Sequence, residues 1–239
     1  MTRLPSALAA ACLLALAACG STGEPVADSA PANVLTAADE AEGWTLLFNG
    51  ETTRGWRGFR REDVPEGWVV EDGTLHRAGS GGDIMTEDQF DDFELRLQWK
   101  ISKGGNSGIF FHVNEERGNA VYETGPEMQV LDDEEHPDGR SPLTSAGSNY
   151  GLHPPIQDVV RPVGQWNDVR IVVDGDRVEH WLNDEKIVEY RLGSPEWLAL
   201  VNGSKFKQWP GYGRAGRGHI ALQDHGDPVW YRNIAIKRL

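Results

Sequence analysis

The sequence predicts an all-β fold, in which two antiparallel sheets form a sandwich of jelly-roll type. From Trp44 onward, short runs rich in β-branched and aromatic residues alternate with turn residues, and no run keeps helical periodicity over a dozen positions. Both cysteines, Cys12 and Cys19, precede this region, so a buried core rather than a disulfide must stabilise it. Long loops at 114–126, 132–165 and 191–217 join the expected strands and are of the kind that shapes a site.

The strands are expected, in chain order, at Thr45–Phe48, Trp68–Glu71, Thr74–Arg77, Phe93–Ile101, Gly108–Val113, Glu127–Leu131, Trp166–Val173, Arg177–Leu182, Lys186–Tyr190, His219–Gln223 and Trp230–Lys237. Asp72-Gly73 and Asp174-Gly175 each separate two such runs and predict tight hairpins, and Asn183-Asp184 is a weaker turn signal. About eleven short strands joined in this way suit two packed sheets.

The N-terminal residues predict export and lipid attachment. Residues 1–18 combine Arg3 with an apolar run, and Leu16-Ala17-Ala18-Cys19 is typical of a lipobox, so we expect a lipoprotein signal and an acylated Cys19. An ordinary cleaved signal is the alternative. Residues 19–42, rich in Ala, Ser, Pro, Thr, Asp and Glu, are expected to form a lipidated flexible tether, and 43–239 the folded domain.

The charge balance restricts the partners. Arg3 is the only charged residue in 1–18, so its loss changes the formal charge from −14 to −15, which argues against nucleic acid. We expect the protein in the bacterial cell envelope, held to a membrane by its lipid. The periplasm and the outer-membrane surface are both open, and Gly20 after Cys19 favours the outer membrane.

Polar side chains fall on one face of two expected strands. Strict alternation places Glu127 and Gln129 on the same face of their strand. By the same rule Gln223 and His225 share a face, and Asp224 follows Gln223 at the rim of the sheet. If both polar rows line the same sheet, they can converge on one ligand.

Four motifs occur in order along the chain: Asn106-Ser107-Gly108-Ile109-Phe110-Phe111, Glu127-Met128-Gln129-Val130-Leu131-Asp132, Gly151-Leu152-His153-Pro154-Pro155 and Ala221-Leu222-Gln223-Asp224-His225-Gly226. Together they resemble the 3-keto-disaccharide hydrolase domain family. The opening Gly43-Trp44-Thr45-Leu46-Leu47-Phe48-Asn49-Gly50 and the closing Trp230-Tyr231-Arg232-Asn233-Ile234 extend the resemblance over nearly all of 43–239.

The resemblance implies a concanavalin-like β-sandwich that cleaves glycosidic bonds of 3-keto-glycosides. It implies as partner an upstream sugar 3-dehydrogenase, which acts through the shared metabolite by oxidising the C3 hydroxyl to a ketone. It leaves open whether the product is a hydrolysed ketosugar or an eliminated enediol.

A ketone at C3 acidifies the C2 proton, so cleavage needs a base, a group that stabilises the C3 oxyanion and a donor for the leaving oxygen. We expect His225 to act as base or acid, with Glu127 as its carboxylate partner or as the alternative base. Gln129, Gln223 and Asp224 would orient hydroxyls. The alternative is that Asp224-His225-Gly226 is only a hydrogen-bonded turn.

Four further residues are candidates for substrate binding. His112 shares strand parity with Gly108, although a satisfied histidine at a strand end is equally expected. His153 lies in a long loop that could wall the site, or it could face solvent. Trp181 and Trp230 could each offer an indole platform to a sugar, although most strand tryptophans belong to a core.

The acidic run Asp132-Asp133-Glu134-Glu135-His136-Pro137-Asp138-Gly139 could bind a divalent cation that assists the C3 oxygen. A solvated acidic loop is the preferred alternative for such a run. The sequence assigns no cofactor beyond this candidate cation.

Two other functions compete with keto-sugar cleavage. A concanavalin-like sandwich on a lipid anchor also suits a non-catalytic carbohydrate-binding module. An ordinary glycosidase would need two carboxyl groups, for which Glu127 with Asp224 or Asp132 is the best pair.

Overall fold

The structure, a computed structural model, describes residues 1–2 and 32–239. Apart from Met1 and Thr2, the expected signal at 1–18 lies outside the described residues, as do Cys19 and the tether up to residue 31. Residues Ala32–Leu239 form one compact unit. No helix in the described part of the chain is long and apolar enough to cross a membrane.

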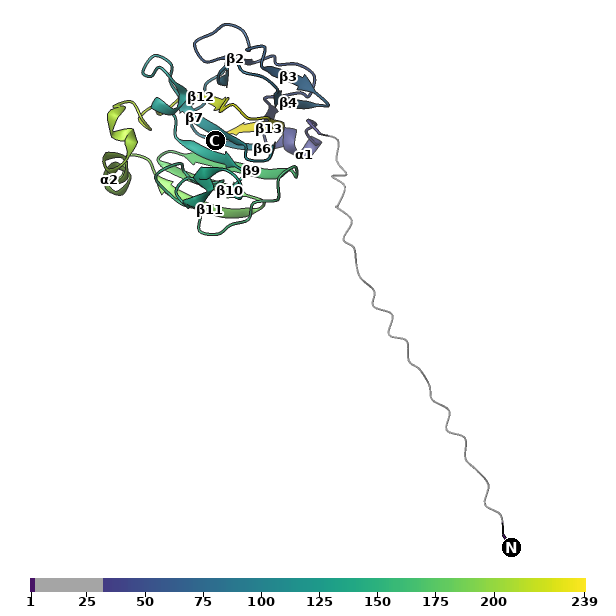
Figure 1. Ribbon diagram of the computed structural model, residues 1–239. Coiled ribbons are helices and arrows are strands. Elements are labelled where there is room, and N and C mark those ends of the chain that lie inside the picture. Colours follow the sequence, from purple (N-terminus) through teal and green to yellow (C-terminus); the bar gives the residue numbers. More distant parts are fainter. Residues whose placement is uncertain (3–31) are drawn as a thin grey trace. The chain divides into compact units, whose positions relative to one another are not determined.

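The larger sheet has eight antiparallel strands in the order β11-β10-β9-β6-β13-β4-β3, with β1 paired to β13 (Figure 1). The strands are β1 Trp44–Leu46, β3 Trp68–Glu71, β4 Thr74–Arg77, β6 Phe93–Ile101, β9 Asn167–Asp174, β10 Arg177–Leu182, β11 Glu185–Arg191 and β13 Val229–Arg238. Both residues of Asp72-Gly73 and of Asn183-Asp184 have positive φ, as type I′ hairpin turns require.

The smaller sheet has five antiparallel strands in the order β2-β5-β12-β7-β8. They are β2 Trp56–Gly58, β5 Ile84–Thr86, β7 Asn106–Val113, β8 Glu127–Leu131 and β12 His219–Leu222. The predicted all-β sandwich of two antiparallel sheets is therefore confirmed. The sequence did not predict β2 and β5, each only three residues long.

The core lies between the two sheets because alternate side chains of their strands face inward. Along β6 every second residue is buried, and these residues are Phe93, Leu95, Leu97, Trp99 and Ile101. From the smaller sheet they meet Ile84, Ile109, Phe111, Met128, Val130, Ile220 and Leu222. The opposite faces of β7, β8 and β12 are therefore directed away from this core.

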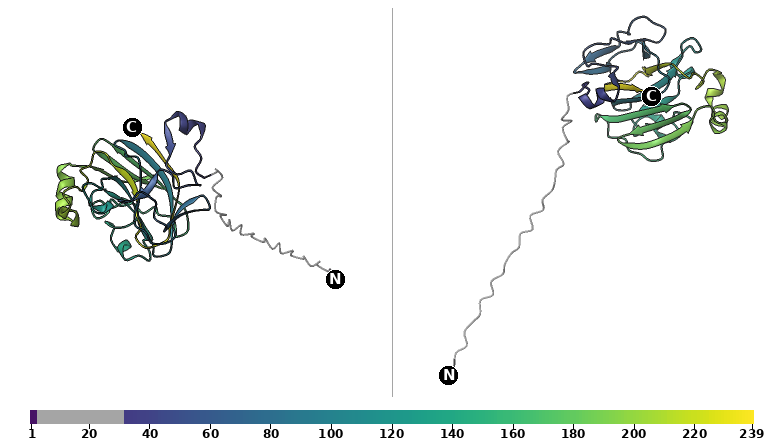
Figure 2. Two further views of the ribbon diagram at one scale, coloured as in Figure 1. Left: turned by 90° about the horizontal axis from the view of Figure 1, so that it is seen from above. Right: turned by 180° about the vertical axis from the view of Figure 1, so that it is seen from behind.

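Two α-helices lie at opposite ends of the domain, α1 Ala37–Ala41 and α2 Pro195–Gly203 (Figures 1 and 2). Three short 3-10 helices complete the structure: η1 Val121–Glu123, η2 Pro137–Arg140 and η3 Lys205–Gln208. The α2 helix occupies a segment predicted to be loop. Ser194 caps it by accepting from the Trp197 amide, and Pro195 occupies its first turn.

Residues 32–42 were expected in the tether, but the structure makes them part of the folded unit. The backbone amides of Asn33 and Asn233 each donate to the side-chain oxygen of the other, at 2.5 and 2.8 Å. Asp39 of α1 accepts from Arg96 of β6 at 2.6 Å. These contacts to β6 and β13 tie the segment to the larger sheet.

Candidate active site

The outer face of the smaller sheet carries polar residues that the sequence analysis predicted to lie at the site. In the strand register Ala221 lies opposite Phe110, and Phe110 lies opposite Glu127. Gly108 lies two residues before Phe110 in β7, and its partner on β8 is Gln129. On its other side, the backbone N–H of Gln223 donates to the Gly108 carbonyl at 3.0 Å. The expected convergence of the two polar rows on one sheet is therefore present.

Glu127 lies at the start of β8 and is only 6% exposed. Its carboxyl group occupies the space above Gly108, where an added Cβ atom would lie 2.3 Å from Glu127 Oε1. The side-chain NH₂ group of Gln129 can donate to Glu127 Oε1 and to the Ser107 carbonyl, each at 3.0 Å, when the amide is oriented with its nitrogen toward them. The missing side chain at Gly108 and the Gln129 amide thus fix the position of the carboxyl group.

The electrostatic surroundings make Glu127 a much weaker acid than an exposed glutamate. Its pKa is raised from 4.5 to about 8, chiefly by burial; the Lys205 ammonium lowers it, and the nearby carboxylates of Asp83 and Asp138 raise it. Within the described residues no Lys or Arg forms an ion pair with this carboxylate. A base of this pKa is matched to a proton transfer near neutral pH.

A second polar group lies farther along the same face, at the start of β7. Asn106 Nδ2 is 3.5 Å from His136 Nε2, and the His136 and His225 rings meet edge to face with centroids 6.1 Å apart. His225 itself is exposed. The buried oxygens Asn106 Oδ1 and Gln223 Oε1 have no hydrogen-bond partner among the residues that the structure describes. Both could accept from ligand hydroxyls.

Aromatic rings from the loop before β9, from β11 and from the chain after β11 form a wall beside the site. Consecutive rings stack with centroids 4.8 Å apart for His153 and Tyr190, 5.2 Å for Tyr190 and Trp197, 5.9 Å for Trp197 and Tyr212, and 4.1 Å for Tyr212 and Phe206. The Tyr212 hydroxyl is buried and finds no hydrogen-bond partner in the described part of the chain. Burial raises the Tyr212 pKa and the Glu127 carboxylate raises it further, which ties this wall to the Glu127 site.

His153, predicted in the wall of the site, lies at one end of this stack. Its Nδ1 atom is 2.9 Å from Asn149 Nδ2, and burial lowers its pKa. The ring supports the aromatic wall. Its role in binding substrate stays a prediction.

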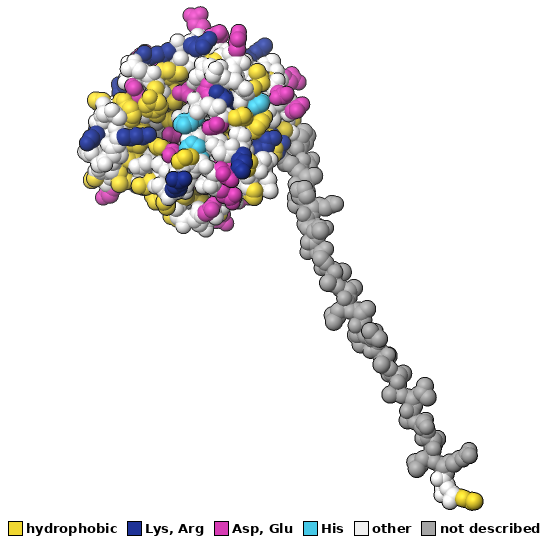
Figure 3. Space-filling view, in the orientation of Figure 1, with side chains coloured by type: hydrophobic (Ala, Val, Ile, Leu, Met, Phe, Trp, Pro, Cys, Tyr) yellow, Lys and Arg dark blue, Asp and Glu magenta, His cyan; other side chains and the backbone are white. Residues whose placement is uncertain are grey.

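Figure 3 shows that the surface chemistry of the face in view is mixed. Histidine side chains are exposed near the middle of the face in view, among acidic, basic and apolar groups. An apolar cluster of Met85, Phe110, Val113, Val121 and Ala221, with Phe59 against it, covers the neighbouring part of the sheet. The site thus combines polar groups with an apolar floor, as sugar recognition requires.

Asp224 was expected to orient a sugar hydroxyl, but its oxygens are already engaged. One accepts from Arg77 Nε at 2.6 Å and the other from the amides of Gly81 and Gly82, both at 2.9 Å. Burial alone would raise the Asp224 pKa, but these hydrogen bonds outweigh it and lower the pKa. The geometry gives Asp224 a structural role at the end of β12, and removes it from the two-carboxylate pair.

His112 does not share the outer face with Gly108, contrary to its strand parity. A β-bulge shifts the pairing between β12 and β7, and His112 has a φ of 51°. Its ring therefore turns inward, where Nε2 lies 2.8 Å from the Asp91 carbonyl and the ring packs edge-on against Phe93 and Phe111. Burial lowers its pKa. His112 is a core residue.

Trp181 and Trp230 lie on the outer face of the larger sheet, away from Glu127. Their strand neighbours are buried in the core, so alternation turns both indoles outward. The Arg170 guanidinium covers Trp181 at 4.3 Å, and Trp230 stacks on His76 at 4.5 Å. The prediction that they contact the same ligand as Glu127 is wrong, because they belong to the other sheet.

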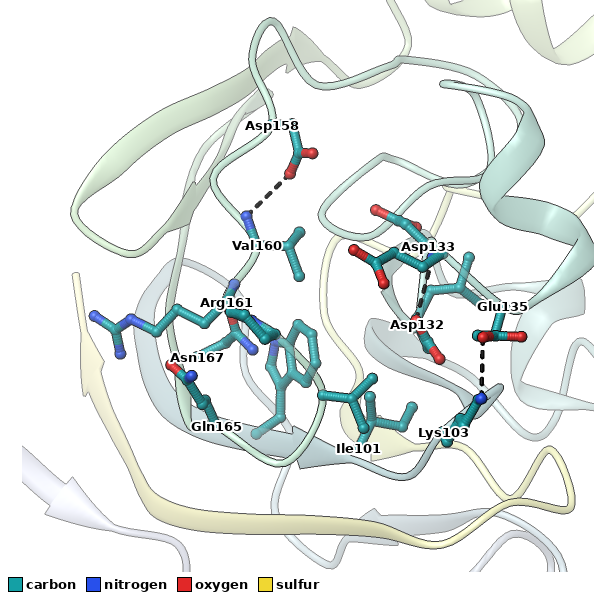
Figure 4. A pocket seen from close by; sticks show the side chains of 15 residues that line it. Ile101, Lys103, Asp132, Asp133, Glu135, Asp158, Val160, Arg161, Gln165 and Asn167 are labelled. Carbon is teal, nitrogen blue, oxygen red and sulfur yellow. Dashed lines mark hydrogen bonds and ion pairs between the residues drawn. The ribbon is translucent and has the colours of Figure 1, made fainter. Parts of the chain in front are cut away.

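The acidic run after β8 lines a separate hollow of about 370 Å³, shown in Figure 4. Asp132 accepts from the amides of Gly104 and Glu134, and Asp133 accepts from the Ala146 amide. Glu135 is paired with Lys103 at 3.1 Å. Across residues 1–2 and 32–239, no three His, Cys, Asp or Glu side chains are grouped so as to hold a metal ion. The geometry thus favours the alternative, an acidic loop.

Several residues of the site were not named from the sequence. Asn106 starts β7 and has the parity of Gly108, which was an available signal. Tyr150 and Tyr212 gave no local signal, because distant loops bring them to Glu127. Asp83 precedes β5, a strand too short to be predicted.

The two-sheet jelly roll, with a carboxyl group, amides and aromatic rings gathered on one sheet face, defines the class of sugar-recognising β-sandwiches. Residues 43–237 match the 3-keto-alpha-glucoside-1,2-lyase-like domain, and the chain belongs to that family. The chain is 39% identical over 231 residues to a 3-keto-disaccharide hydrolase of Bacteroides thetaiotaomicron, an alignment that covers 84% of this chain and 80% of that protein.

Solved structures agree with this assignment. One from Parabacteroides distasonis, described as a glycosyl hydrolase, is 38% identical with a TM-score of 0.83 and matches 87% of this chain and 100% of its own. A second from the same species, described likewise, is 30% identical with a TM-score of 0.64 and matches 82% of this chain and 99% of its own. The family resemblance of the sequence motifs is confirmed.

Proposed function

We propose that this protein is an enzyme that cleaves the glycosidic bonds of 3-keto-glycosides. Family membership and the activity named for the Bacteroides thetaiotaomicron relative support the substrate class. The observation that carries the proposal is the buried Glu127 carboxyl group, whose pKa of about 8 suits a base that removes a carbon-bound proton.

In the proposed reaction the 3-keto sugar lies on the outer face of the smaller sheet. Glu127 takes the C2 proton, and the C2–H electrons form a C2=C3 enolate with negative charge on the C3 oxygen. The enolate then reforms the C3 ketone, a C1=C2 double bond forms, and the C1–O bond breaks. Addition of water at C1 and return of a proton to C2 complete a net hydrolysis.

The remaining polar groups have roles in this scheme. His225, which is exposed and contacts the His136 ring, is proposed to donate a proton to the leaving oxygen. The unpartnered oxygens of Asn106 and Gln223 would accept from sugar hydroxyls, and Gln129 would hold the Glu127 carboxyl group in place. Binding oriented by several fixed polar groups lowers the entropic cost of reaching the reactive geometry.

The cellular setting is part of the proposal. The lipobox at Leu16–Cys19 supports a lipoprotein anchored in the bacterial envelope, in the periplasm or at the outer-membrane surface. A 3-keto-glycoside must be supplied by oxidation of a sugar at C3, so an upstream sugar 3-dehydrogenase would be the metabolic partner. Mass analysis of the mature N-terminus tests the diacylglyceryl modification of Cys19.

The decisive experiment compares matched 3-keto and unoxidised glucosides as substrates, with product analysis by mass spectrometry. We expect the wild-type protein to cleave only the keto sugar, and Glu127→Gln, which keeps the size of the side chain, to be inactive. Cleavage of the unoxidised glucoside would instead favour an ordinary glycosidase. Binding of either sugar without turnover would favour a carbohydrate-binding module.

A further inference from the structure

Lys205, the first residue of η3, carries a positive charge to the Glu127 site. Its Nζ atom lies 4.3 Å from the centroid of the Tyr150 ring and 5.4 Å from that of the Phe206 ring. Lys103, Lys186 and Lys237 each pair with a carboxylate, but among the described residues Lys205 has no such ion pair. Its ammonium group is therefore available to a ligand.

The two aromatic rings under Lys205 are themselves fixed. The Tyr150 amide donates to the Glu127 carbonyl at 3.1 Å, and the Tyr150 hydroxyl donates to Asp138 Oδ2 at 3.1 Å. Phe206 is buried and stacks on Tyr212. Lys205 is thus held beside the strand that carries Glu127 by cation-π contacts with the Tyr150 and Phe206 rings.

Most of the charged groups that act on Glu127 are carboxylates, which would oppose a negative charge on a bound sugar. The groups that interact electrostatically with Glu127 are Lys205, the carboxylates of Asp83 and Asp138, and the hydroxyls of Tyr150, Tyr212 and Tyr231. Within the described residues Lys205 is the one cation in this set. Negative charge that develops on a sugar beside these carboxylates is opposed by them and stabilised by Lys205.

We propose that Lys205 is a catalytic residue whose ammonium group contacts the C3 oxygen of the keto sugar and stabilises the enolate. This proposal rests on the proposed function. When the C2–H bond breaks, the proton goes to Glu127 and the electron pair to the C2=C3 bond, which places one negative charge on the C3 oxygen. Lys205 keeps its own protons and balances that charge until the C1–O bond breaks and the ketone reforms.

The test uses the full chain and three variants: Lys205→Met, Lys205→Arg and the control Lys207→Met, which removes a neighbouring exposed cation of η3. We expect Lys205→Met to lower kcat/KM for a 3-keto-glucoside about a hundredfold, as loss of an oxyanion-stabilising group does. Lys205→Arg should keep most of the activity because it keeps the charge, and Lys207→Met should match the wild type. Circular dichroism checks that each variant is folded.

A second measurement separates an electrostatic role from a merely structural one. Without Lys205 the carboxyl group of Glu127 should titrate at higher pH, both in the pH profile of kcat/KM and in the carbon-13 NMR shift of the substrate-free protein. An unchanged titration, or a kcat/KM within threefold of the wild type in Lys205→Met, overturns the role of Lys205. If the wild type itself leaves the 3-keto-glucoside intact, the proposed function fails, and the proposed role of Lys205 fails with it.

Discussion

The Glu127 carboxyl group is buried and forms no ion pair within residues 1–2 and 32–239, and its neighbours on the sheet determine its position. It fills the space left by Gly108 and receives a hydrogen bond from Gln129. The neutral acid is favoured by burial, while Gln129 and Lys205 favour the carboxylate. These opposing effects leave the pKa of Glu127 close to the pH at which an enzyme must transfer protons.

Replacing Gly108 by alanine should displace the carboxyl group, because the new Cβ atom would overlap Glu127 Oε1. A shift of about 1 Å in a reacting group costs about a hundredfold in rate, and we expect a loss of that size in kcat on a 3-keto-glucoside. Gly203→Ala is the matched control, since nothing lies within 4 Å of its added Cβ atom. Equal activities of the two variants would contradict this placement of Glu127.

Glu127→Gln should be stabilised relative to the wild type as the pH rises. The folded-state pKa of about 8 lies above the ordinary value of 4.5, so between these values the wild-type folded state binds more protons than the unfolded state. The wild-type free energy of unfolding therefore decreases as the pH rises through this window, by roughly 1.4 kcal/mol per pH unit. The glutamine variant has no such proton and should not show this decrease.

Urea unfolding at pH 5 and at pH 8 measures this difference. The exposed Glu116→Gln serves as the control and should follow the wild type at both pH values. A stability difference between Glu127→Gln and the wild type that is the same at both pH values would show that Glu127 titrates normally.

Sequence alternation identified the face of a side chain where the strand is regular, but not the sheet to which the strand belongs. It placed Glu127 with Gln129 correctly, because β8 is regular. It grouped Trp181 and Trp230 with the same site, although long-range pairing assigns them to the larger sheet. No local pattern encodes that assignment.

At the scale of elements, the sequence predicted eleven of the strands that the described residues form and missed β2 and β5. The bounds of β3, β4, β6, β8 and β10 agree with the expectation, since turn residues or apolar alternation mark them. The three residues of β2, like those of β5, carry too little periodicity to be recognised. The bulge at His112 reverses a side chain, and its cause lies in the pairing with β12 rather than in the residues themselves.

The link between Asp224 after β12 and Arg77 at the end of β4 should be a structural joint. Both side chains are less than 10% exposed, so Asp224→Ala would leave a buried guanidinium unpaired, at a cost of about 3 kcal/mol. For a domain of this size the thermal midpoint should fall by about 6–12 °C.

Asp176→Ala is the matched control, because it breaks an exposed pair with Arg191 that should contribute less than about 1 kcal/mol. Calorimetry measures both variants. If Asp224→Ala unfolds at the wild-type temperature but loses activity, Asp224 binds substrate as the sequence suggested and the structural role is wrong.

At the scale of the whole molecule, the folded unit begins before the residue that the sequence suggested. A chain that starts at residue 43 lacks the reciprocal bonds of Asn33 with Asn233 and the pair of Asp39 with Arg96. We expect it to be about 2–3 kcal/mol less stable than a chain that starts at residue 32, since each lost hydrogen bond contributes about 1 kcal/mol.

Denaturant titrations of the two chains give the comparison, and equal midpoints would show that residues 32–42 add nothing. The composition of this segment resembles that of the tether, so no local pattern predicted its docking. The fold class was predictable because turns and alternation repeat over the whole chain, whereas the docking depends on a few contacts across 200 positions of sequence.

The seclusion of Glu127 has an isotopic consequence. A carboxyl group that is only 6% exposed exchanges its proton with solvent slowly compared with one on the surface. If the hydrogen taken from C2 remains on Glu127 until water has added at C1, the same atom returns to the sugar. In deuterium oxide the cleaved ketosugar should therefore retain more protium at C2 than the solvent contains. Mass spectrometry of early product measures this fraction. Complete deuteration at C2 would mean that the proton on Glu127 exchanges with water during the reaction. The hydrogen at C2 of the product would then be the one that the substrate carried there.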